Sequence, residues 1–324
     1  MRVLSGIQPS GAIHLGNYLG ALRKWSVEQH REAFYCVVDL HALTQPIEPA
    51  EVHRQTLETA AALLACGIDP LKSTLFIQSQ VPYHTRLNWL LECVASYGEL
   101  RRMTQFKDKS GDQGSHRVGL LTYPVLMASD ILLYDTDLVP VGDDQRQHLE
   151  LTRELAERFN SRYGETFKVP NSVVPTAGAR VMDMQEPTKK MSKSESSPQG
   201  KILIFEDPAV IERKIKRAVT DTDTDVRYDV KNKPGIANLL QILAALTEET
   251  PQILAAKYSS YGELKKDVAA ALVENLRPLS QRYHDFLGDL GELSRLLRLG
   301  SDYATAIAAP VYERAATAMG LVSL

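Results

Sequence analysis

The chain has 324 residues, of which 44% are hydrophobic and 24% charged, and its formal net charge is −3 with a pI near 6.3. This length suits two domains, or one domain with an appended lobe. The balance of charge excludes a general nucleic-acid-binding protein, which would be strongly basic, and no apolar run is long enough to span a membrane.

Apolar runs and helical patterns alternate over the first half of the chain, and this alternation predicts right-handed βαβ units around a parallel sheet. Strands are expected at residues 2–7, 33–38, 74–78, 138–141 and 173–182. Helices are expected at residues 15–29, 49–66, 85–97, 120–134 and from Gly142 to about Tyr163. Ligands of such sheets bind at the carboxyl ends of the strands.

From Pro208 onward the sequence shows helical patterns only, at residues 208–219, 236–246, 261–287 and 303–319. We therefore expect a Rossmann-like α/β domain over residues 1–195 and an all-helical lobe over residues 196–324. A basic stretch at 98–119 is expected as an insertion in the first domain, followed by helices over 120–163. Because the N-terminus enters a strand at once, no signal peptide is expected.

A glycine-rich turn follows the first strand and precedes the first helix, with the sequence GIQPSGAIHLGN over residues 6–17. Such a turn places backbone N–H groups and the positive end of a helix dipole where they can bind phosphate. His14 and Asn17 lie one turn apart, so both can donate to the same phosphate. The alternative is an ordinary tight turn between a strand and a helix.

A second stretch, KMSKS at residues 190–194, lies between Pro187 and Pro198 and is therefore expected to form a loop. Lysine is a mobile point charge suited to phosphate, so this loop could close over a triphosphate. The alternative is a solvated basic loop.

Together these stretches resemble the two ATP motifs of class I aminoacyl-tRNA synthetases. The match is finer for the bacterial tryptophanyl-tRNA synthetase family, over residues 5 to about 282. It is carried by the segments GIQPSG, GNYLGA, MTQFK, DILLY, VPVGDDQ and PTKKMSKS.

This resemblance implies that ATP and L-tryptophan react to give tryptophanyl-adenylate and pyrophosphate, and that tryptophan is then transferred to tRNA(Trp). It further implies Mg²⁺ bound through the triphosphate, a cytoplasmic enzyme with no membrane association, and a homodimer. The dimer interface is expected around residues 97–134 and the helices of 120–163. For tRNA the basic candidates are Arg213, Lys214, Lys216, Arg217, Lys231 and Lys233.

The resemblance also implies roles for single residues. Catalytic roles fall to His14, Asn17, Lys190 and Lys193, where Asn17 replaces the second histidine of the class motif, as is usual in tryptophanyl enzymes. ATP binding falls to Gln8, Pro9, Ser10, Gly16, Asn17, Gly142, Asp143, Asp144, Val181, Lys190, Met191, Ser192, Lys193 and Ser194, with Lys107 and Lys109 as further lysines that reach phosphate. Tryptophan binding falls to Gln8, His41, Tyr123, Met127, Asp130, Val139, Val141 and Gln145.

Some of these residues allow plainer interpretations. The apolar ones, Met127, Val139 and Val141, would serve equally in ordinary core packing. Asp130 lies in an otherwise apolar stretch, where a carboxylate is costly to bury unless it is paired. It either faces the surface, pairs with a nearby arginine, or accepts the indole N–H of tryptophan.

Other classes of protein share parts of this pattern. Tyrosyl-tRNA synthetases have the same fold and motifs, but the DILLY segment and the compact helical C-terminus argue against them. A small nucleotidylyltransferase would not need the lysine loop, and a regulatory synthetase-like protein without activity would usually lose a motif. Cys36, Cys66 and Cys93 lie too far apart in sequence for a metal-binding motif, so we expect buried free thiols and no protein-bound metal.

Overall fold

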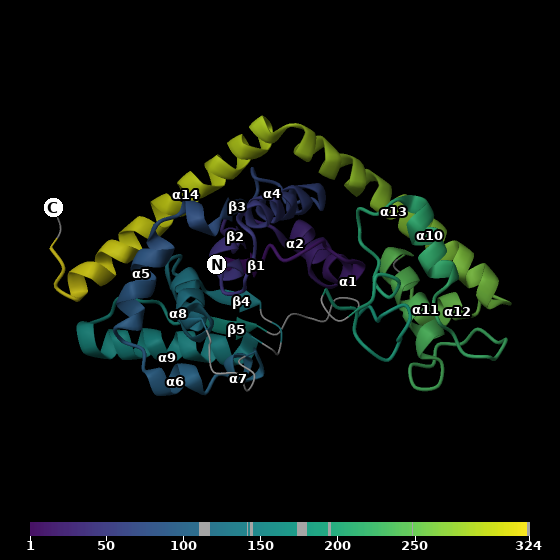
Figure 1. The fold of residues 1–324 in the computed structure, drawn as a ribbon, viewed down its shortest axis with the longest axis horizontal. Coiled ribbons are helices and arrows are strands. Elements are labelled where there is room, and N and C mark those ends of the chain that lie inside the picture. Colours follow the sequence, from purple (N-terminus) through teal and green to yellow (C-terminus); the bar gives the residue numbers. More distant parts are fainter. Residues whose placement is uncertain are drawn as a thin grey trace.

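The structure is a computed structural model that describes residues 1–109, 117–140, 142, 145–173, 180–193, 196–247 and 249–322. Five parallel strands form one sheet in the order β3-β2-β1-β4-β5 (Figure 1). The strands are β1 Val3–Ile7, β2 Ala33–Val37, β3 Thr74–Ile77, β4 Leu138–Pro140 and β5 Asn171–Val173. All residues of β2 and β3 are buried, as expected for parallel strands that helices cover on both faces.

The strand order reverses beside β1. On one side Val3 pairs with Ala33 of β2, and on the other side it pairs with Leu138 of β4. A doubly wound sheet opens a crevice at the carboxyl ends of the strands where the order reverses, and ligands bind there. The glycine-rich turn leaves β1 at this edge, so the predicted α/β fold class is confirmed together with the placement of the turn.

Helices surround the sheet and continue beyond it. Those of the first part are α1 Leu15–Asn17, a π-helical turn Tyr18–Leu22, α2 Arg23–Glu28, α3 Asp39–Ala42, α4 Pro49–Ala65, a 3-10 turn η2 Gln78–Gln80, α5 Tyr83–Glu92, α6 Tyr97–Arg101, α7 Thr104–Lys109, α8 Val118–Leu132 and α9 Arg146–Tyr163. Those of the second part are α10 Pro208–Lys216, α11 Pro234–Thr247, α12 Pro251–Ala255, α13 Tyr261–Gly288 and α14 Leu290–Ala318.

Several element boundaries differ from the predictions. The helix expected at 85–97 ends at Glu92, and a separate helix, α6, begins at Tyr97, where Ser96 and Glu99 form a capping box. The helix expected at 303–319 begins at Leu290, where Asp289 accepts a hydrogen bond from the backbone of Glu292. Of the strand expected at 173–182, Val173 is the last residue of β5, Met182 forms an isolated β-bridge with Lys190, and residues 174–179 lie outside the described part of the chain. The loop expected after the basic helix at 98–116 falls largely on residues 110–116, outside the described part of the chain.

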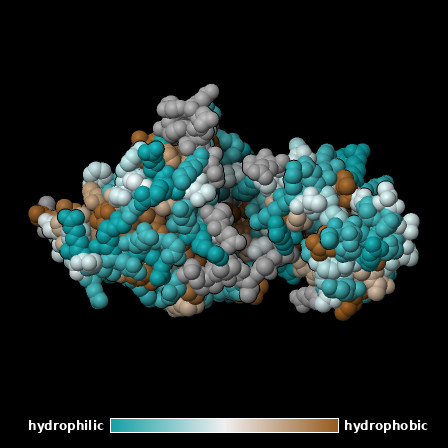
Figure 2. All heavy atoms as spheres, turned by 90° about the horizontal axis from the view of Figure 1, so that it is seen from below, coloured by the Kyte–Doolittle hydropathy of each residue, from teal (hydrophilic) through white to brown (hydrophobic). Residues whose placement is uncertain are grey.

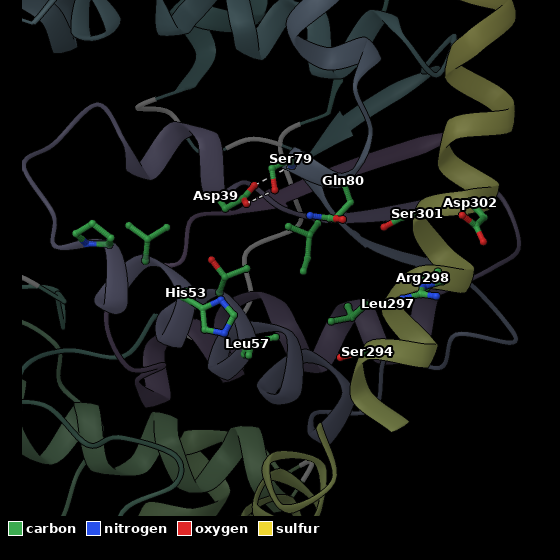
Figure 3. Close-up of a pocket in the computed structure, with 14 residues that line it drawn as sticks. Asp39, His53, Leu57, Ser79, Gln80, Ser294, Leu297, Arg298, Ser301 and Asp302 are labelled. Atoms are coloured by element: carbon green, nitrogen blue, oxygen red, sulfur yellow. Dashed lines mark hydrogen bonds between the residues drawn. The ribbon is translucent and has the colours of Figure 1, made fainter. Parts of the chain in front are cut away.

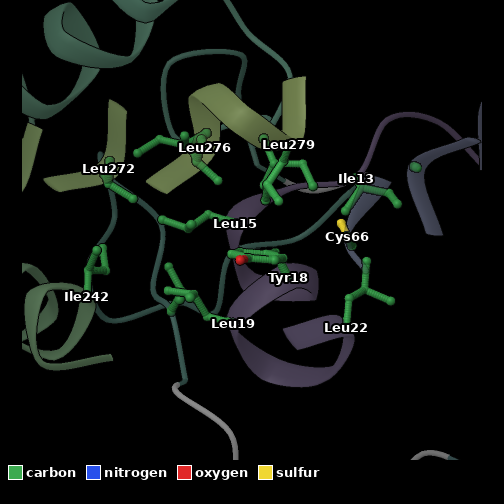
Figure 4. Close-up of a cluster of buried hydrophobic side chains, with 14 of the residues drawn as sticks. Ile13, Leu15, Tyr18, Leu19, Leu22, Cys66, Ile242, Leu272, Leu276 and Leu279 are labelled. Atoms are coloured by element: carbon green, nitrogen blue, oxygen red, sulfur yellow. The ribbon is translucent and has the colours of Figure 1, made fainter. Parts of the chain in front are cut away.

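The glycine-rich turn and the helical lobe share one buried core. Leu15, Tyr18 and Leu19 face Leu272 and Leu276 of α13 in Figure 4, and all five belong to one cluster of buried apolar side chains. The face of the lobe seen in Figure 2 is largely hydrophilic. The segment that follows the glycine-rich turn is therefore held by residues more than two hundred positions away.

A second core lies on the other face of the sheet and includes α14. Ala304, Ala308 and Val311 of α14 are buried with Phe34 and Phe76 of the strands. At Gly300 the helix passes so close to β3 that a Cβ there would lie 1.8 Å from the carbonyl oxygen of Leu75. The last helix of the predicted lobe thus packs on the sheet domain (Figure 1), and the division at residue 195 stays a prediction.

Two smaller expectations have clear outcomes. Cys36 and Cys66 are buried free thiols, but Cys93 is exposed, so the prediction is wrong for Cys93. Cys93 follows the last residue of α5 as its C-cap and thus leaves the buried face of that helix. Over the described residues, no helix combines the length and the apolar character needed to cross a membrane.

Candidate active site

The glycine-rich turn ends in a reciprocal pair between His14 and Asn17. The backbone N–H of His14 donates to Asn17 Oδ1 at 3.2 Å, and the backbone N–H of Asn17 donates to His14 Nδ1 at 3.3 Å. Since Nδ1 accepts, a neutral imidazole here carries its proton on Nε2. His14 Nε2–H and Asn17 Nδ2 are then the side-chain donors that the pair can offer to a ligand.

The lysine loop lies directly beside this turn. Met191 is buried, its backbone N–H donates to the carbonyl of Val181 at 3.1 Å, and its Cβ lies 3.8 Å from where a Cβ of Gly16 would be. Lys190 pairs with Met182 in a β-bridge. Two motifs about 175 residues apart in sequence are thus brought together, as the phosphate-site prediction requires.

Asn238 of α11 fixes the base of the lysine loop. Its Oδ1 accepts from the backbone N–H of Met182 at 2.9 Å, and its Nδ2 donates to the carbonyl of Met182 at 3.1 Å. Asn238 is buried, so both backbone groups of Met182 depend on it. The helical lobe therefore sets the position of the strand-like segment from which Lys190 extends.

Positive charge surrounds His14. Burial lowers the pKa of His14, and Lys193, Lys190 and Lys201 lower it further, to about 4. Burial also lowers the pKa of Lys193. His14 is thus a neutral hydrogen-bond donor at pH 7, and the cations around it make a site for an anion with several charges.

A cavity of about 750 Å³ opens at the crevice beside β1. It lies at the carboxyl ends of β1, β2 and β4 and against α8, the position that the sheet order predicts. Seven of the eight residues assigned to tryptophan line it: Gln8, His41, Tyr123, Met127, Asp130, Val139 and Gln145. The eighth, Val141, lies outside the described residues.

Asp130 is buried at the bottom of this cavity with three partners. Oδ1 accepts from Gln78 Nε2 and from His84 Nδ1, both at 2.7 Å, and Oδ2 lies 2.8 Å from His41 Nε2. Burial raises the pKa of this carboxyl, but the hydrogen bonds with His41 and His84 outweigh it and hold the pKa below its usual range. Asp130 is therefore an ionised, buried carboxylate, and neither the surface position nor the arginine pair is found.

Gln78 and His84 were not singled out from the sequence. They lie 52 and 46 residues before Asp130, and no local pattern links them to it. His84 Nε2 in turn lies 2.8 Å from Tyr134 Oη, which orients the imidazole so that Nδ1–H donates to the carboxylate. The carboxylate of Asp130 is therefore held by residues whose contact with it only the fold reveals.

The polar end of the cavity brings Tyr123 and Gln145 together through His148. Tyr123 Oη lies 3.0 Å from His148 Nε2, and His148 Nδ1 lies 2.8 Å from Gln145 Oε1. His148 is buried and was also missed by sequence reasoning. Gln8 donates to the carbonyl of His41 at 3.3 Å and so joins β1 to α3 at the rim.

Comparison with known proteins identifies the family. The family described as tRNA synthetases class I (W and Y) matches residues 1–277. The chain belongs to this family.

Similar members of the synthetase family match along nearly the whole chain. Tryptophan–tRNA ligase 1 of Streptomyces coelicolor is 52% identical over 327 residues, which cover 99% of this chain and 97% of that protein. Tryptophan–tRNA ligase of Corynebacterium glutamicum is 51% identical over 323 residues, with 97% and 94% covered.

Solved synthetase structures match in fold as well. Tryptophanyl-tRNA synthetase from Mycoplasma pneumoniae has a TM-score of 0.88 at 36% identity, covering 99% of this chain and 98% of that one. The enzyme from Campylobacter jejuni, described as complexed with ADP and tryptophan, has a TM-score of 0.87 at 33% identity, covering 99% of this chain and 100% of that one. The expected family is therefore confirmed.

Of the other site residues predicted from the motifs, some lie at the cavity, the glycine-rich turn or the lysine loop, and others lie outside the described part of the chain. Gly142 lines the cavity, Ser10 lies exposed in the glycine-rich turn beside the buried Pro9, and Val181 is buried beneath the lysine loop. The backbone N–H of Ser192 donates to Ser196 Oγ at 3.0 Å. Asp143, Asp144 and Ser194 lie outside the described residues, as does the side chain of Lys109, so their roles stay predictions.

Proposed function

We propose that this protein is a tryptophan–tRNA ligase, which activates L-tryptophan with ATP and transfers it to the 3′ end of tRNA(Trp). The observation that carries the proposal is the buried carboxylate of Asp130 in the crevice beside β1, in the same molecule as the cationic site around His14. Relatives named tryptophan–tRNA ligase support it at about 50% identity over nearly the full length.

In the first step the carboxylate of tryptophan attacks the α-phosphorus of ATP, and the bond to pyrophosphate breaks. The nucleophile is already an anion, so no protein base is needed, and catalysis consists of positioning and charge stabilisation. We assign His14 Nε2–H, Asn17 Nδ2 and the ammonium groups of Lys190 and Lys193 to the phosphate oxygens. Their hydrogen bonds strengthen as charge moves onto the leaving pyrophosphate.

Mg²⁺ belongs to this proposal as an ion carried by the nucleotide. The described residues contain no group of three His, Cys, Asp or Glu side chains placed to ligate a metal. Mg²⁺ keeps several waters and binds readily through phosphate oxygens, so we place it on the triphosphate. There it would neutralise charge as pyrophosphate forms.

Asp130 would select tryptophan by accepting the indole N–H. Oδ1 already accepts from two donors, whereas Oδ2 contacts only His41 among the described residues and can accept a second hydrogen bond. Met127 and Val139 would line the ring, and Tyr123 and Gln145 would hold the α-amino group. A site built around a substrate hydrogen bond rejects an analogue lacking it by roughly 10⁴–10⁵, far more than apolar fit alone.

Two of the six basic residues predicted to contact tRNA are buried in ion pairs. Lys214 is buried and paired with Glu206, and Lys233 is buried and paired with Asp221, Asp223 and Asp225. The prediction that these two lysines contact tRNA is therefore wrong. We propose that the exposed Arg213, Lys216, Arg217 and Lys231 contribute to tRNA binding, in a cytoplasmic homodimer.

The specificity claim is tested with the substitution Asp130→Ala. The ratio of kcat/KM for tryptophan to kcat/KM for 3-benzothienylalanine, in which sulfur replaces the ring N–H, is measured in wild type and variant. The ratio does not depend on the fraction of folded enzyme. It is expected to fall at least about tenfold, since the variant loses the acceptor that only tryptophan uses.

Asp137→Ala is the matched control, because Asp137 is an acidic residue at the opposite end of β4 that binds the backbone N–H of Arg2. It should leave the ratio unchanged. If Asp130→Ala keeps the wild-type preference for tryptophan, Asp130 has a structural role only and the pocket assignment is wrong.

A further inference from the structure

A second cavity, of about 650 Å³, lies between α4, η2 and α14 (Figure 3). It shares no lining residue with the cavity that contains Asp130. Ile77, Leu57 and Leu297 give it an apolar floor, and the exposed His53, Arg298 and Asp302 stand at its rim. Its volume and its mixture of an apolar floor with a few polar groups are those of small-molecule sites.

Two buried hydroxyl groups belong to this cavity and have no hydrogen-bond partner among the described residues. They are Thr56 Oγ1 on α4 and Ser301 Oγ on α14, and both residues are 6% exposed. Buried hydroxyls in folded proteins are nearly always hydrogen-bonded. In Figure 3 Ser301 points from α14 toward Gln80, so a molecule in the cavity could provide the missing partner.

The charged side chains at the rim indicate the chemistry of that molecule. Arg298 makes no ion pair or hydrogen bond with any described residue, whereas Arg295, one turn earlier on α14, is paired with Glu292 at 2.6 Å. A guanidinium binds a carboxylate through two parallel hydrogen bonds. Asp302, four residues further along α14, adds an acceptor for an O–H or N–H donor on the same molecule.

Two elements that line this cavity also carry residues that support Asp130, since η2 contributes Ser79 and Gln80 to the lining and α3 contributes Asp39. Within η2, Gln78 donates to Asp130, while the next residue, Ser79, donates from its backbone N–H and its Oγ to Asp39 at 2.9 and 2.5 Å. Asp39 begins α3, which carries His41, the partner of Asp130 Oδ2. A molecule that moves η2 or α3 from one side therefore changes the tryptophan pocket on the other.

We propose that this cavity is a second small-molecule site that binds a small organic acid with an apolar body, and that its occupant alters tryptophan affinity through η2 and α3. The acid group would bind Arg298, a hydroxyl or amino group would meet Asp302, and Ser301 and Thr56 would complete the polar contacts. The coupling to tryptophan rests on the proposed function, whereas binding to the cavity does not.

Binding is tested on the full chain by ¹⁹F NMR with 4-fluoromandelate, which combines a carboxylate, a hydroxyl and an apolar ring. The neutral analogue 1-(4-fluorophenyl)ethane-1,2-diol is the ligand control. Arg298→Gln is expected to weaken binding about tenfold or more, and Ser301→Ala about two- to tenfold. Arg295→Gln, which lies outside the cavity on the same helix, should bind the probe as wild type does.

The binding proposal is overturned if 4-fluoromandelate fails to bind at millimolar concentration, or if Arg298→Gln binds it as tightly as Arg295→Gln. Coupling is tested by repeating the titration with saturating tryptophan, since the effect of each ligand on the other must be equal. We expect the affinity for the probe to change about fivefold or more. Equal affinity with and without tryptophan overturns the coupling, and failure of tryptophan itself to bind contradicts the proposed function instead.

Discussion

His14 illustrates how the environment of one residue decides its chemistry. Its imidazole is buried next to three lysines, and its Nδ1 accepts from the backbone of Asn17. Burial and neighbouring cations both disfavour a charged imidazole. His14 is therefore a neutral hydrogen-bond donor at pH 7, and the proposed role in phosphate binding leaves the positive charge to the lysines of the loop.

This environment predicts a pH dependence of stability that His14→Gln removes. The pKa of His14 is about 4 in the folded chain and 6.5 in the unfolded chain, so between these values the unfolded chain binds more protons. The free energy of unfolding should therefore rise with pH across this window. The contribution of His14 is fully present above pH 6.5 and is lost as pH falls toward 4.

The measurement is urea unfolding of wild type and His14→Gln at pH 7 and pH 4.5. The stability of wild type relative to the variant should fall by about 2 kcal/mol on going to the lower pH. His53→Gln is the control, since His53 is exposed on α4. A constant difference between wild type and His14→Gln at both pH values would contradict a neutral, buried His14.

Asp130 could be singled out from the sequence, whereas its partners Gln78 and His84 could not. A carboxylate in an apolar stretch is itself a signal, because such a group is buried only with partners. Its partners Gln78 and His84 come from η2 and α5, and nothing near them in sequence indicates that they meet a carboxylate. Long-range pairing of this kind depends on the strand order, which no local pattern contains.

At the scale of elements, the lysine loop depends on α11 through Asn238. Asn238→Ala would leave the backbone N–H and C=O of Met182 without their partners, which costs about 2 kcal/mol of folding free energy. Met182 pairs with Lys190, so the loop would also lose its fixed position. Misplaced catalytic groups lower rates by up to roughly a hundredfold.

We therefore expect Asn238→Ala to lower the single-turnover rate of adenylate formation about tenfold or more. KM for tryptophan should change little, because neither Asn238 nor the lysine loop lines the cavity proposed for tryptophan. Gln241→Ala is the control on the same helix, since Gln241 donates to Tyr228 at 2.7 Å and does not contact Met182. An unchanged rate in folded Asn238→Ala would show that the loop is positioned without α11.

The elements that were predicted best are those with a clear hydrophobic pattern in their own sequence. The buried strands β2 and β3 coincide with their apolar runs to within one residue, because parallel strands need apolar side chains on both faces. The helix α14 was placed thirteen residues too late, since its first turns, Leu290 to Asp302, carry a mixed polar pattern. Its packing on β3 at Gly300 is a tertiary contact, which periodicity does not report.

At the scale of the whole molecule, we expect a homodimer. Tyr97 and Val118 are large apolar side chains exposed at the starts of α6 and α8, and Trp89 is exposed on α5. The helices α5 and α6 both pack against α8, and exposed apolar residues on neighbouring helices commonly mark an interface. Sedimentation velocity at micromolar concentration should give about twice the monomer mass of 36.0 kDa.

Val118→Glu should shift the dimer toward monomer, because it would bury a charge in the interface. Val27→Glu is the control, since Val27 is exposed on α2 and belongs to none of these three helices. A wild-type chain that sediments only at 36.0 kDa would contradict the expected dimer.

The central claim is that tryptophan binds in the crevice beside β1 and reacts there with ATP to form tryptophanyl-adenylate. Tryptophan-dependent exchange of pyrophosphate into ATP measures this directly, without tRNA. We predict exchange with tryptophan that exceeds exchange with tyrosine by roughly 10⁴ or more in kcat/KM, since tyrosine cannot place an N–H donor on Asp130. Exchange supported equally by tyrosine, or no exchange with tryptophan by the folded protein, would contradict the claim.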